Sequence, residues 1–581
     1  MNMFSYFRRQ KKIDSDDVTE IFPLGPIGVP FEDTTQHFAM IGATGSGKTI
    51  CMRMLMQEVM AGITPGSDRR ALVYDAKQDM PSLLHGMDVQ VPLKLLNPFD
   101  NRGVAWDIAR DVNEPRIAIE IVFTLMPELS ENTPFFSDAA RHLTYAVILS
   151  FMKRKLHWTL GDIIRGLSSQ KLLRRILAAT PVTKSFLPRY CYDKRLLANI
   201  LTTAATKIMP FEPLAGAWEA VSERVSLEDW VQGSSVLVLG NSETSRHAID
   251  AINRCIVKRA VDLTLQQGES FTRRSWFFLD EITEAGRLDG LVSLCKKGRS
   301  KGACVVMALQ SIAGLRNPRL YGPDTAAEIL GQIGHRFIGR LECPETAEWA
   351  ARLFGDQEVM QVLRSDSFSH NSQSRSTSHS QQVTTRKAVM PAEFMSVPAC
   401  NDVKGMTGYY LSQTAGAFRH CLDADLLFGE LLDKPSSTTP NFILHDIESQ
   451  YLAPWSPEQE AIFAPRLQPS RKTSQNPKVP PRPSPRPHAA PKSAKKPAQQ
   501  RDETDLHDAA QSPQDATRDV ADDKAAKLNK LLQAMEEMAD DSSEMDDESS
   551  DTAEGDRHQQ RRAEERRERQ VRGKRRSEPE R

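Results

Sequence analysis

The stretch Gly42-Ala43-Thr44-Gly45-Ser46-Gly47-Lys48-Thr49 matches the phosphate-binding pattern G-x-x-x-x-G-K-[ST] at every fixed position. The apolar run His37–Ile41 precedes it and a helix-like run from Ile50 follows it, which is the context that this motif requires. Glycines allow backbone N–H groups to surround a β-phosphate, and Lys48 is predicted to reach the β- and γ-phosphates. The Thr49 hydroxyl is predicted to bind Mg²⁺. The stretch therefore predicts a site for ATP and Mg²⁺.

Two carboxylates follow another apolar run further along the chain. Asp280 and Glu281 come directly after Trp276–Leu279. Asp280 is predicted to help hold Mg²⁺, and Glu281 is predicted to act as the base that polarises the attacking water. A strand followed by a helix cap would give the same pair of residues. The phosphate-binding loop upstream favours the catalytic interpretation.

Three other positions carry weaker signals. Gln310 ends a buried run and is predicted to sense the γ-phosphate and position water, although a strand-end amide can also cap a loop. Arg299 lies in the turn Gly298–Gly302 and is a candidate arginine finger for a neighbouring subunit, with a hydrated surface arginine as the alternative. Asp75 and Lys77 end another run, where they support the site or form a salt-bridged turn.

The region from Gln36 to Leu432 alternates short, nearly continuous apolar runs with helical patterns, which predicts an α/β fold with a parallel sheet covered on both faces. The predicted strands are His37–Ile41, Ala71–Tyr74, Ser235–Leu239, Trp276–Leu279, Ala303–Ala308 and Arg336–Arg340. Helical patterns without a strand dominate residues 114–225, with segments at Ile117–Leu125, Ser137–Lys155, Leu172–Ala178 and Arg195–Ile208. The polar stretch Ser365–Thr385 lacks apolar periodicity and predicts a long mobile loop.

These shifts in pattern predict five regions. Residues 1–30 are expected to be a lead-in, 31–113 and 226–440 the two parts of a nucleotide-binding domain, and 114–225 an all-α insertion. Residues 441–581 are expected to be a linker and a disordered charged tail, with a short amphipathic helix at 520–540. In that tail, residues 531–556 hold eleven acidic and no basic side chains, and residues 557–581 hold eleven basic and five acidic ones.

Composition excludes several classes of protein. The 581 residues are 40% apolar and 26% charged with a formal charge of −1, which is typical of a folded protein with a polar tail. The apolar runs are too short to span a bilayer, and the N-terminus has no signal-peptide core. Eight scattered cysteines indicate reduced thiols rather than a disulfide or zinc framework. Secreted, membrane-spanning, collagen-like and zinc-ribbon proteins are therefore excluded.

Taken in order, the motifs resemble those of type IV secretion coupling proteins of the TraG/TraD type, over about residues 20–430. The segments that carry the resemblance are the phosphate-binding loop with its preceding HFAMI, YDAKQD, Asn97-Pro98-Phe99, Pro134–Arg141, LDE at Leu279–Glu281, GRSKG, ALQS and Tyr321-Gly322. The resemblance implies a RecA-like P-loop NTPase core with an inserted all-α domain that assembles into a homo-hexamer. It also implies recruitment of a relaxase–DNA complex or of protein effectors, and ATP hydrolysis coupled to their export. The implied partners are relaxosome proteins, DNA bound without sequence preference, and the ATPases and inner-membrane components of the secretion channel.

One feature departs from that family, whose members usually begin with transmembrane helices, whereas this chain reaches Gly42 with none. We therefore expect a cytoplasmic protein that associates peripherally with the bacterial inner membrane, through a partner that supplies the anchor. Two other functions stay open. One is a recruitment platform with weak ATPase activity, in which the tail captures partners. The other is a double-stranded DNA pump of the FtsK/HerA type, against which the all-α insertion argues.

Overall fold

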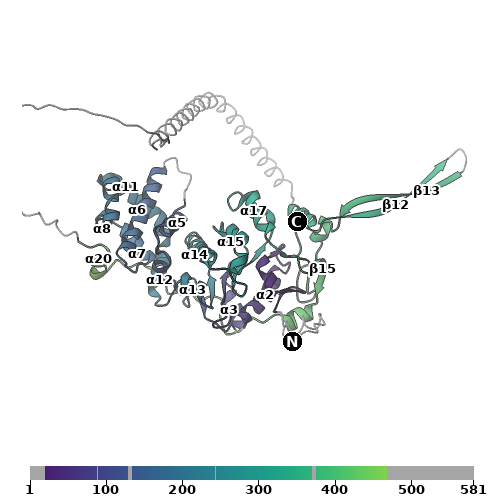
Figure 1. Cartoon of the computed structure of the whole chain (residues 1–581), viewed down its shortest axis with the longest axis horizontal. Coiled ribbons are helices and arrows are strands. Elements are labelled where there is room, and N and C mark those ends of the chain that lie inside the picture. Colours follow the sequence, from purple (N-terminus) through teal and green to yellow (C-terminus); the bar gives the residue numbers. More distant parts are fainter. Residues whose placement is uncertain (1–19, 88, 128–133, 243, 370–373, 467–581) are drawn as a thin grey trace, which may run out of the picture. The chain divides into compact units, whose positions relative to one another are not determined.

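The computed structural model describes residues 20–466, except for residues 88, 128–133, 243 and 370–373 (Figure 1). The predicted linker and tail beyond residue 466, with the amphipathic helix at 520–540, lie outside the described residues. A nine-stranded sheet forms the centre of the described chain. In spatial order its strands are β15 (Gly416–Leu422), β14 (Met406–Ser412), β11 (His335–Ile338), β3 (Phe38–Ile41), β10 (Ala303–Leu309), β9 (Arg274–Leu279), β4 (Arg69–Tyr74), β8 (Val236–Leu239) and β5 (Leu93–Leu96).

The strands from β11 to β5 are parallel, and β14 and β15 extend one edge in antiparallel fashion. All six strands predicted from the sequence are present, within a residue or two of the expected bounds. They read as continuous apolar runs because helices cover both faces of the sheet. In β9, for example, Phe277 and Leu279 enter one buried cluster, whereas Trp276 and Phe278 enter the other.

Two groups of helices cover these faces. The helices α2 (Lys48–Gly62) and α3 (Met80–Gly86) contribute to the cluster that contains Trp276. The opposite cluster takes side chains from α14 (Arg246–Gln266), α15 (Leu291–Lys297), α17 (Gly322–Gly331) and α18 (Pro344–Phe354). This layered α/β arrangement confirms the predicted fold class, and it brings the carboxyl ends of the parallel strands to one edge.

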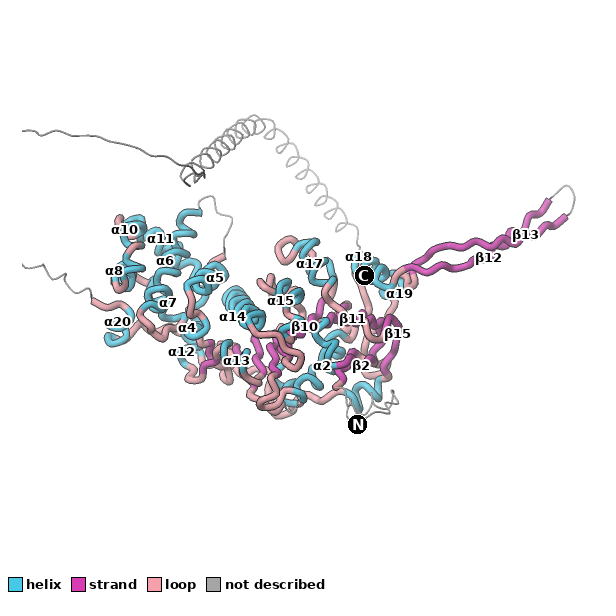
Figure 2. The backbone as a smooth tube through the Cα atoms, viewed as in Figure 1, coloured by secondary structure: helices cyan, strands magenta, loops and turns pink. Residues whose placement is uncertain are grey.

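A group of helices that Figure 2 shows close together connects β6 (Ala105–Trp106) to β7 (Arg224–Val225) along the chain, and these two strands pair in parallel. Its α-helices are α4 (Ile108–Asp111), α5 (Pro115–Leu125), α6 (Pro134–Lys153), α7 (Leu160–Leu167), α8 (Gln170–Ala178), α9 (Pro181–Lys184), α10 (Phe186–Tyr190), α11 (Lys194–Ile208) and α12 (Glu212–Ala220). The four helical segments predicted here are all present. The domain limits drawn at residues 114 and 225 stay a prediction.

A buried carboxylate joins the two ends of this helical group. Asp111, which is 0% exposed, accepts hydrogen bonds from Trp106 Nε1 at 2.6 Å, Ser226 Oγ at 2.7 Å and the Leu227 backbone N–H at 2.8 Å. Burial raises the pKa of Asp111, and these donors oppose that rise. The carboxylate therefore holds together two segments that are more than a hundred residues apart in the sequence.

Two expectations about the ends of the folded region are corrected. The lead-in contains a hairpin of β1 (Ile21–Leu24) and β2 (Ile27–Pro30), whose apolar side chains pack against α2. At the other end, residues 441–466 do not form a linker. Trp455 donates to Asp162 at 2.6 Å and stacks on Phe463 of α20 (Pro457–Phe463), so that aromatic burial fixes this segment on the helical group.

The stretch Ser365–Thr385 is not a loop. It belongs to a hairpin of β12 (Asp356–Ser369) and β13 (Ser374–Lys387), which are paired in register over fourteen residues each (Figure 1). The prediction was wrong because it relied on apolar alternation, which identifies a strand only when one face is buried. Here the backbone hydrogen bonds define the strands, and described side chains on both faces, such as Met360 and Leu363, are exposed.

Candidate nucleotide site

The phosphate-binding loop connects β3 to α2 at the carboxyl edge of the sheet. Its start is fixed by the neighbouring segments, since the Gly42 N–H donates to the carbonyl of Leu309, the last residue of β10, at 3.1 Å, and the Ala43 N–H donates to the Arg340 carbonyl, just after β11, at 2.7 Å. Gly45 and Gly47 have φ values of 72° and 95°, a left-handed conformation that side chains disfavour. The two glycines therefore permit the curled backbone that turns N–H groups toward a phosphate.

Two side chains of the loop lack the partners that a phosphate would provide. Lys48 is buried, and its Nζ donates to the loop's own carbonyls, to Gly42 at 2.6 Å and to Ala43 at 3.1 Å. Burial lowers the pKa of Lys48, and the carboxylates of Glu281 and Asp280 oppose that effect. Ser46 Oγ is buried and has no hydrogen-bond partner among the described residues. A polar, anionic ligand fits this arrangement, because it would satisfy both side chains.

The sheet register brings the predicted carboxylates to the loop. Leu309 of β10 pairs with Ile41 of β3, and Met307 pairs with Leu279 of β9, so the residues that follow these strands share one edge. Asp280 is 2% exposed and Glu281 is 8% exposed. Glu281 has a φ of 55°, which is strained for a side-chain-bearing residue and is typical of functional positions.

Two neighbours hold the Glu281 carboxylate. Thr283 Oγ1 donates to Oε1 at 3.0 Å, and Gln310 Nε2 donates to Oε2 at 3.2 Å. Gln310 therefore contacts the predicted base directly. Thr283 was missed in the sequence, because a hydroxyl two residues after a glutamate carries no signal of its own.

Lys77 lies between the two oxygens that were predicted to bind Mg²⁺. Its Nζ donates to Thr49 Oγ1 at 3.1 Å and to Asp280 Oδ2 at 3.0 Å. The pairing of Tyr74 with Leu279 explains this, because Lys77 follows β4 just as Asp280 follows β9. A hydroxyl and a carboxylate that already share one cation are oxygen ligands of the kind that Mg²⁺ prefers, so the residues fit that ion. Among the described residues, no cluster of His, Cys, Asp and Glu offers another metal site.

Asp75 stabilises the turn after β4 that carries Lys77. Its carboxylate oxygens accept hydrogen bonds from the backbone N–H groups of Asp79 and Met80, each at 3.2 Å, at the start of α3. Burial raises the pKa of Asp75 to about 7. Of the two residues that the sequence left undecided, Lys77 contacts the site and Asp75 supports the turn that carries it.

These groups surround a pocket of about 230 Å³. Its lining consists of Ala43, Thr44, Gly45, Ser46, Gly47, Lys48, Thr49, Ile50, Lys77, Glu281, Gln310 and Cys400. Cys400 could not be predicted from the sequence, because it approaches the loop only through the fold, where its N–H donates to the Gly45 carbonyl at 2.8 Å.

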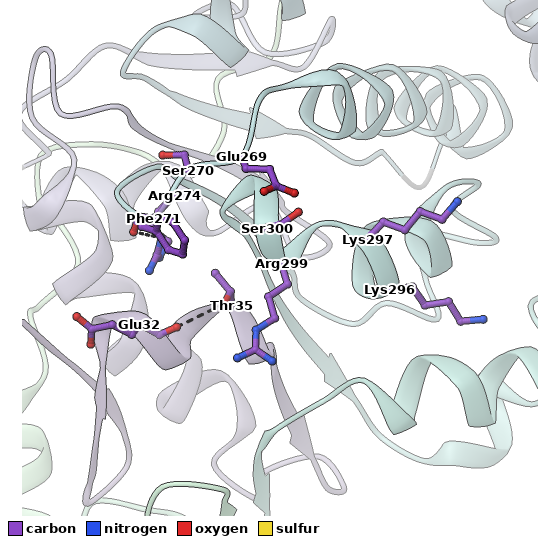
Figure 3. Close-up of a pocket in the computed structure, with 10 residues that line it drawn as sticks. All are labelled: Glu32, Thr35, Glu269, Ser270, Phe271, Arg274, Lys296, Lys297, Arg299 and Ser300. Carbon is purple, nitrogen blue, oxygen red and sulfur yellow. Dashed lines mark hydrogen bonds between the residues drawn. The ribbon is translucent and has the colours of Figure 1, made fainter.

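Arg299 lies apart from this pocket. It precedes β10, whereas the nucleotide site follows that strand, and seven strand residues span about 20 Å. Arg299 lines a different pocket of about 630 Å³, where it extends toward Glu32 and Thr35 while Lys296 and Lys297 point elsewhere (Figure 3). Its guanidinium is exposed and has no ion pair within the described part of the chain. The structure therefore does not join Arg299 to the site on its own chain.

A phosphate-binding loop, a strand-end carboxylate pair and a glutamine directly after the strand between them are the features of the P-loop NTPase fold with a RecA-like core. Residues 22–409 match the model of the type IV secretion-system coupling protein DNA-binding domain, and the chain belongs to this family.

Known proteins are similar to this chain in sequence or in fold. Coupling protein TraD of Escherichia coli (strain K12) is 22% identical over 383 residues, which are 64% of this chain and 51% of that protein. The chain thus spans about half the length of that relative. A structure of the bacterial conjugative coupling protein TrwBdeltaN70 superposes with a TM-score of 0.57 at 18% identity, covering 76% of this chain and 94% of the other. Plasmid coupling protein TrwB in complex with ADP and Mg²⁺ gives 0.56 at 18% identity, covering 76% and 95%. No helix within the described residues is both long and apolar enough to cross a membrane.

Proposed function

We propose that this protein is an ATP-hydrolysing coupling protein that recruits a relaxase–DNA complex or protein effectors to a type IV secretion channel and helps to drive their transfer. The observation that carries the proposal is the meeting of Lys48, Thr49, Asp280, Glu281 and Gln310 at one sheet edge. Membership of the coupling-protein family supports a relaxase–DNA complex or protein effectors as the cargo. The solved complex of TrwB with ADP and Mg²⁺ supports ATP and Mg²⁺ as the ligands.

Nucleotide binding begins with Lys48. Its ammonium exchanges the carbonyls of Gly42 and Ala43 for phosphate oxygens, while the loop N–H groups and the start of α2 bind the β-phosphate. Thr49 and Asp280 would hold Mg²⁺, which neutralises phosphate charge when bound. This exchange requires Lys77 to leave its place between those two residues.

Hydrolysis depends on Glu281. Its carboxylate accepts the proton of the attacking water, and the hydrogen bonds from Thr283 and Gln310 keep the carboxylate pointing in one direction. Gln310 also follows directly after β10, the strand between the loop strand and the carboxylate strand, where it can position that water. The left-handed backbone at Glu281 adds to this preorganisation.

Arg299 acts on a neighbouring copy in this proposal. An exposed guanidinium without an ion pair on its own chain is available to stabilise transition-state charge in the next subunit of a homo-hexamer. Mixing the Arg299→Ala and Glu281→Gln variants should then restore part of the turnover, because each can complete the other's site. An absence of recovery would exclude Arg299 from this role.

The test of the main proposal is ATP hydrolysis by the purified protein, with and without DNA, across a salt series. Wild-type protein should hydrolyse ATP, DNA should stimulate the rate at low salt, and Lys48→Ala should abolish nucleotide binding or turnover. Glu281→Gln should bind ATP and fail to hydrolyse it. Unchanged turnover in Lys48→Ala would refute the site, whereas negligible wild-type turnover would favour a recruitment platform.

A further inference from the structure

The hairpin of β12 and β13 has two open strand edges. In the described part of the chain these strands pair only with each other, and α18 is the one described helix that packs against either of them beyond isolated contacts. Figure 1 shows the two strands side by side, with no other labelled element along most of their length. In an antiparallel pair, every second residue directs its N–H and C=O away from the partner strand. Long open edges of this kind are templates for pairing with a further strand.

The hairpin also carries apolar side chains that its own fold leaves uncovered. Met360, Val362 and Val383 are 61%, 60% and 60% exposed. Met360 lies directly opposite Val383, and Val362 is two residues further along β12, so the three side chains share one face. A two-stranded hairpin on its own is marginally stable in water. A neighbouring strand at each edge would shield these side chains and satisfy the edge backbone groups.

The two strands of the hairpin carry opposite charge. Residues 356–369 of β12 contain three acidic side chains and one basic one, whereas residues 374–387 of β13 contain three basic and no acidic ones. Lys387 and Asp356 form an ion pair at 3.0 Å within the hairpin. Glu358 on β12 and Arg386 on β13 are exposed and have no ion pair with any residue that the structure describes.

This distribution of charge favours a second copy of the chain as the occupant of the open edges. The acidic edge of one hairpin complements the basic edge of another, so the same surface supplies both halves of the contact. A nucleic acid would be attracted by β13 and repelled by the carboxylates of β12 beside it.

The antiparallel pairing inside the hairpin also suits a ring of copies. When hairpins stand side by side in the same orientation, β12 of one copy runs opposite to β13 of the next, because the two strands run opposite to each other within each hairpin. Every new pair is then antiparallel as well. Such a contact uses a different surface on each of the two copies, which is the kind of interface that closes into a ring. In a closed ring of hairpins no strand edge stays open.

We propose that β12 of one copy pairs edge to edge with β13 of the next, and that the hairpins of a ring together form a closed antiparallel β-barrel. The inference rests on the proposed function for the homo-hexamer, in which six copies of a two-stranded hairpin supply the whole barrel. It adds a surface that joins the copies and lies outside the nucleotide pocket, to whose lining the hairpin contributes no residue.

Disulfide formation between two full-length variants, each with one added cysteine, tests the direction of pairing. Gln361→Cys on β12 and Gln382→Cys on β13 occupy positions that share a face, because Gln361 and Gln382 are opposite each other within one hairpin. Oxidation of their mixture with copper phenanthroline should link neighbouring copies. Either variant alone should show only the background set by the exposed Cys421 of the wild-type protein, since β12 does not meet β12 and β13 does not meet β13.

Val359→Cys and Leu363→Cys take the place of Gln361→Cys in two parallel mixtures, so that a stagger of two residues between copies is also detected. Linkage should exceed the background in at least one of the three mixtures. Linkage in none of them would overturn the proposal. Equal linkage in a single variant alone would do so too, because it would indicate a two-fold contact in place of a ring.

Sedimentation velocity of the full-length protein at low ionic strength measures the strength of association. Glu358→Lys and Arg386→Glu each place like charges on adjoining strands, so each should weaken association by about three- to tenfold. The double variant exchanges the two charges and should return association to near the wild-type value. The matched control is Glu458→Lys, which reverses an exposed acid on α20 and should have no effect. An equal loss in this control, or a double variant without recovery, would overturn the proposal.

ATP hydrolysis separates this inference from the proposed function. Turnover per subunit in the single-charge variants should recover at high protein concentration, because the nucleotide pocket is intact. Normal turnover together with unchanged association in both variants would refute the barrel alone. A wild-type protein that binds no nucleotide but forms the mixed disulfide would refute the proposed function and leave the barrel standing. Unchanged association with weakened binding of a labelled DNA duplex would show that the hairpin contacts nucleic acid, and would overturn the inference.

Discussion

Replacing Lys77 by methionine removes the cation that lies between the two predicted Mg²⁺ ligands, at 3.1 Å from Thr49 Oγ1 and 3.0 Å from Asp280 Oδ2. Asp280 is almost fully buried, so its charge is poorly hydrated, whereas the Lys77 side chain is 49% exposed. We therefore expect the ammonium of Lys77 to compete with Mg²⁺ for the same oxygens. Methionine keeps an unbranched side chain that is one atom shorter, and it removes the charge together with the hydrogen-bond donors to Thr49 and Asp280.

The size of the expected change in Mg²⁺ affinity follows from the burial of Asp280 and the partial exposure of Lys77. Two unit charges 3.0 Å apart attract by about 5 kcal/mol at an effective dielectric constant of about 20, before desolvation and entropy are subtracted. Exposed pairs retain about 0–1 kcal/mol, and removing one partner of a buried pair costs about 3–5 kcal/mol. A half-exposed lysine on a buried aspartate falls between these limits, at about 1–2 kcal/mol. Lys77→Met should therefore tighten Mg²⁺ binding to nucleotide-free protein by about tenfold.

Isothermal titration calorimetry of MgCl₂ into nucleotide-free protein, at constant ionic strength, measures this affinity. Lys94→Met is the matched control, because Lys94 also forms an ion pair, with Glu223 at the edge strand β5, far from the loop in the sheet order. Unchanged or weaker Mg²⁺ binding in Lys77→Met would refute the competition. A loss of ATP affinity in Lys77→Met when EDTA removes Mg²⁺, without a change in Mg²⁺ affinity, would also refute it, because Lys77 would then bind phosphate directly.

Three other predictions concern the carboxylates and a buried histidine. Gln310→Ala should lower the rate of ATP hydrolysis by about tenfold to a hundredfold with ATP affinity unchanged, because Glu281 loses one of its two positioning donors; an unaltered rate would exclude that role. Asp111→Ala should destabilise the protein by about 3 kcal/mol in urea unfolding, because buried donors at Trp106 and Leu227 lose their acceptor; a loss below about 1 kcal/mol would contradict this. Burial lowers the pKa of His37 to about 4 from its usual 6.5, so the unfolded chain binds the extra proton and stability should fall as the pH decreases from 6.5 to 4. Asparagine tolerates the φ of 63° at this position, so His37→Asn should lack this part of the pH dependence of stability. Urea unfolding of the wild-type and variant proteins over the same pH range would measure the difference.

The sequence was sufficient to predict the parallel sheet and the groups at its edge, because both depend on local patterns. A continuous apolar run such as Trp276–Leu279 is buried wherever the chain places it, and a phosphate-binding loop is contained in eight residues. The contact of Cys400 was not predictable, and the sequence left Lys77 between two alternatives, because both depend on which strands become neighbours. The hairpin β12–β13 was missed for a related reason, since a strand exposed on both faces has no apolar alternation.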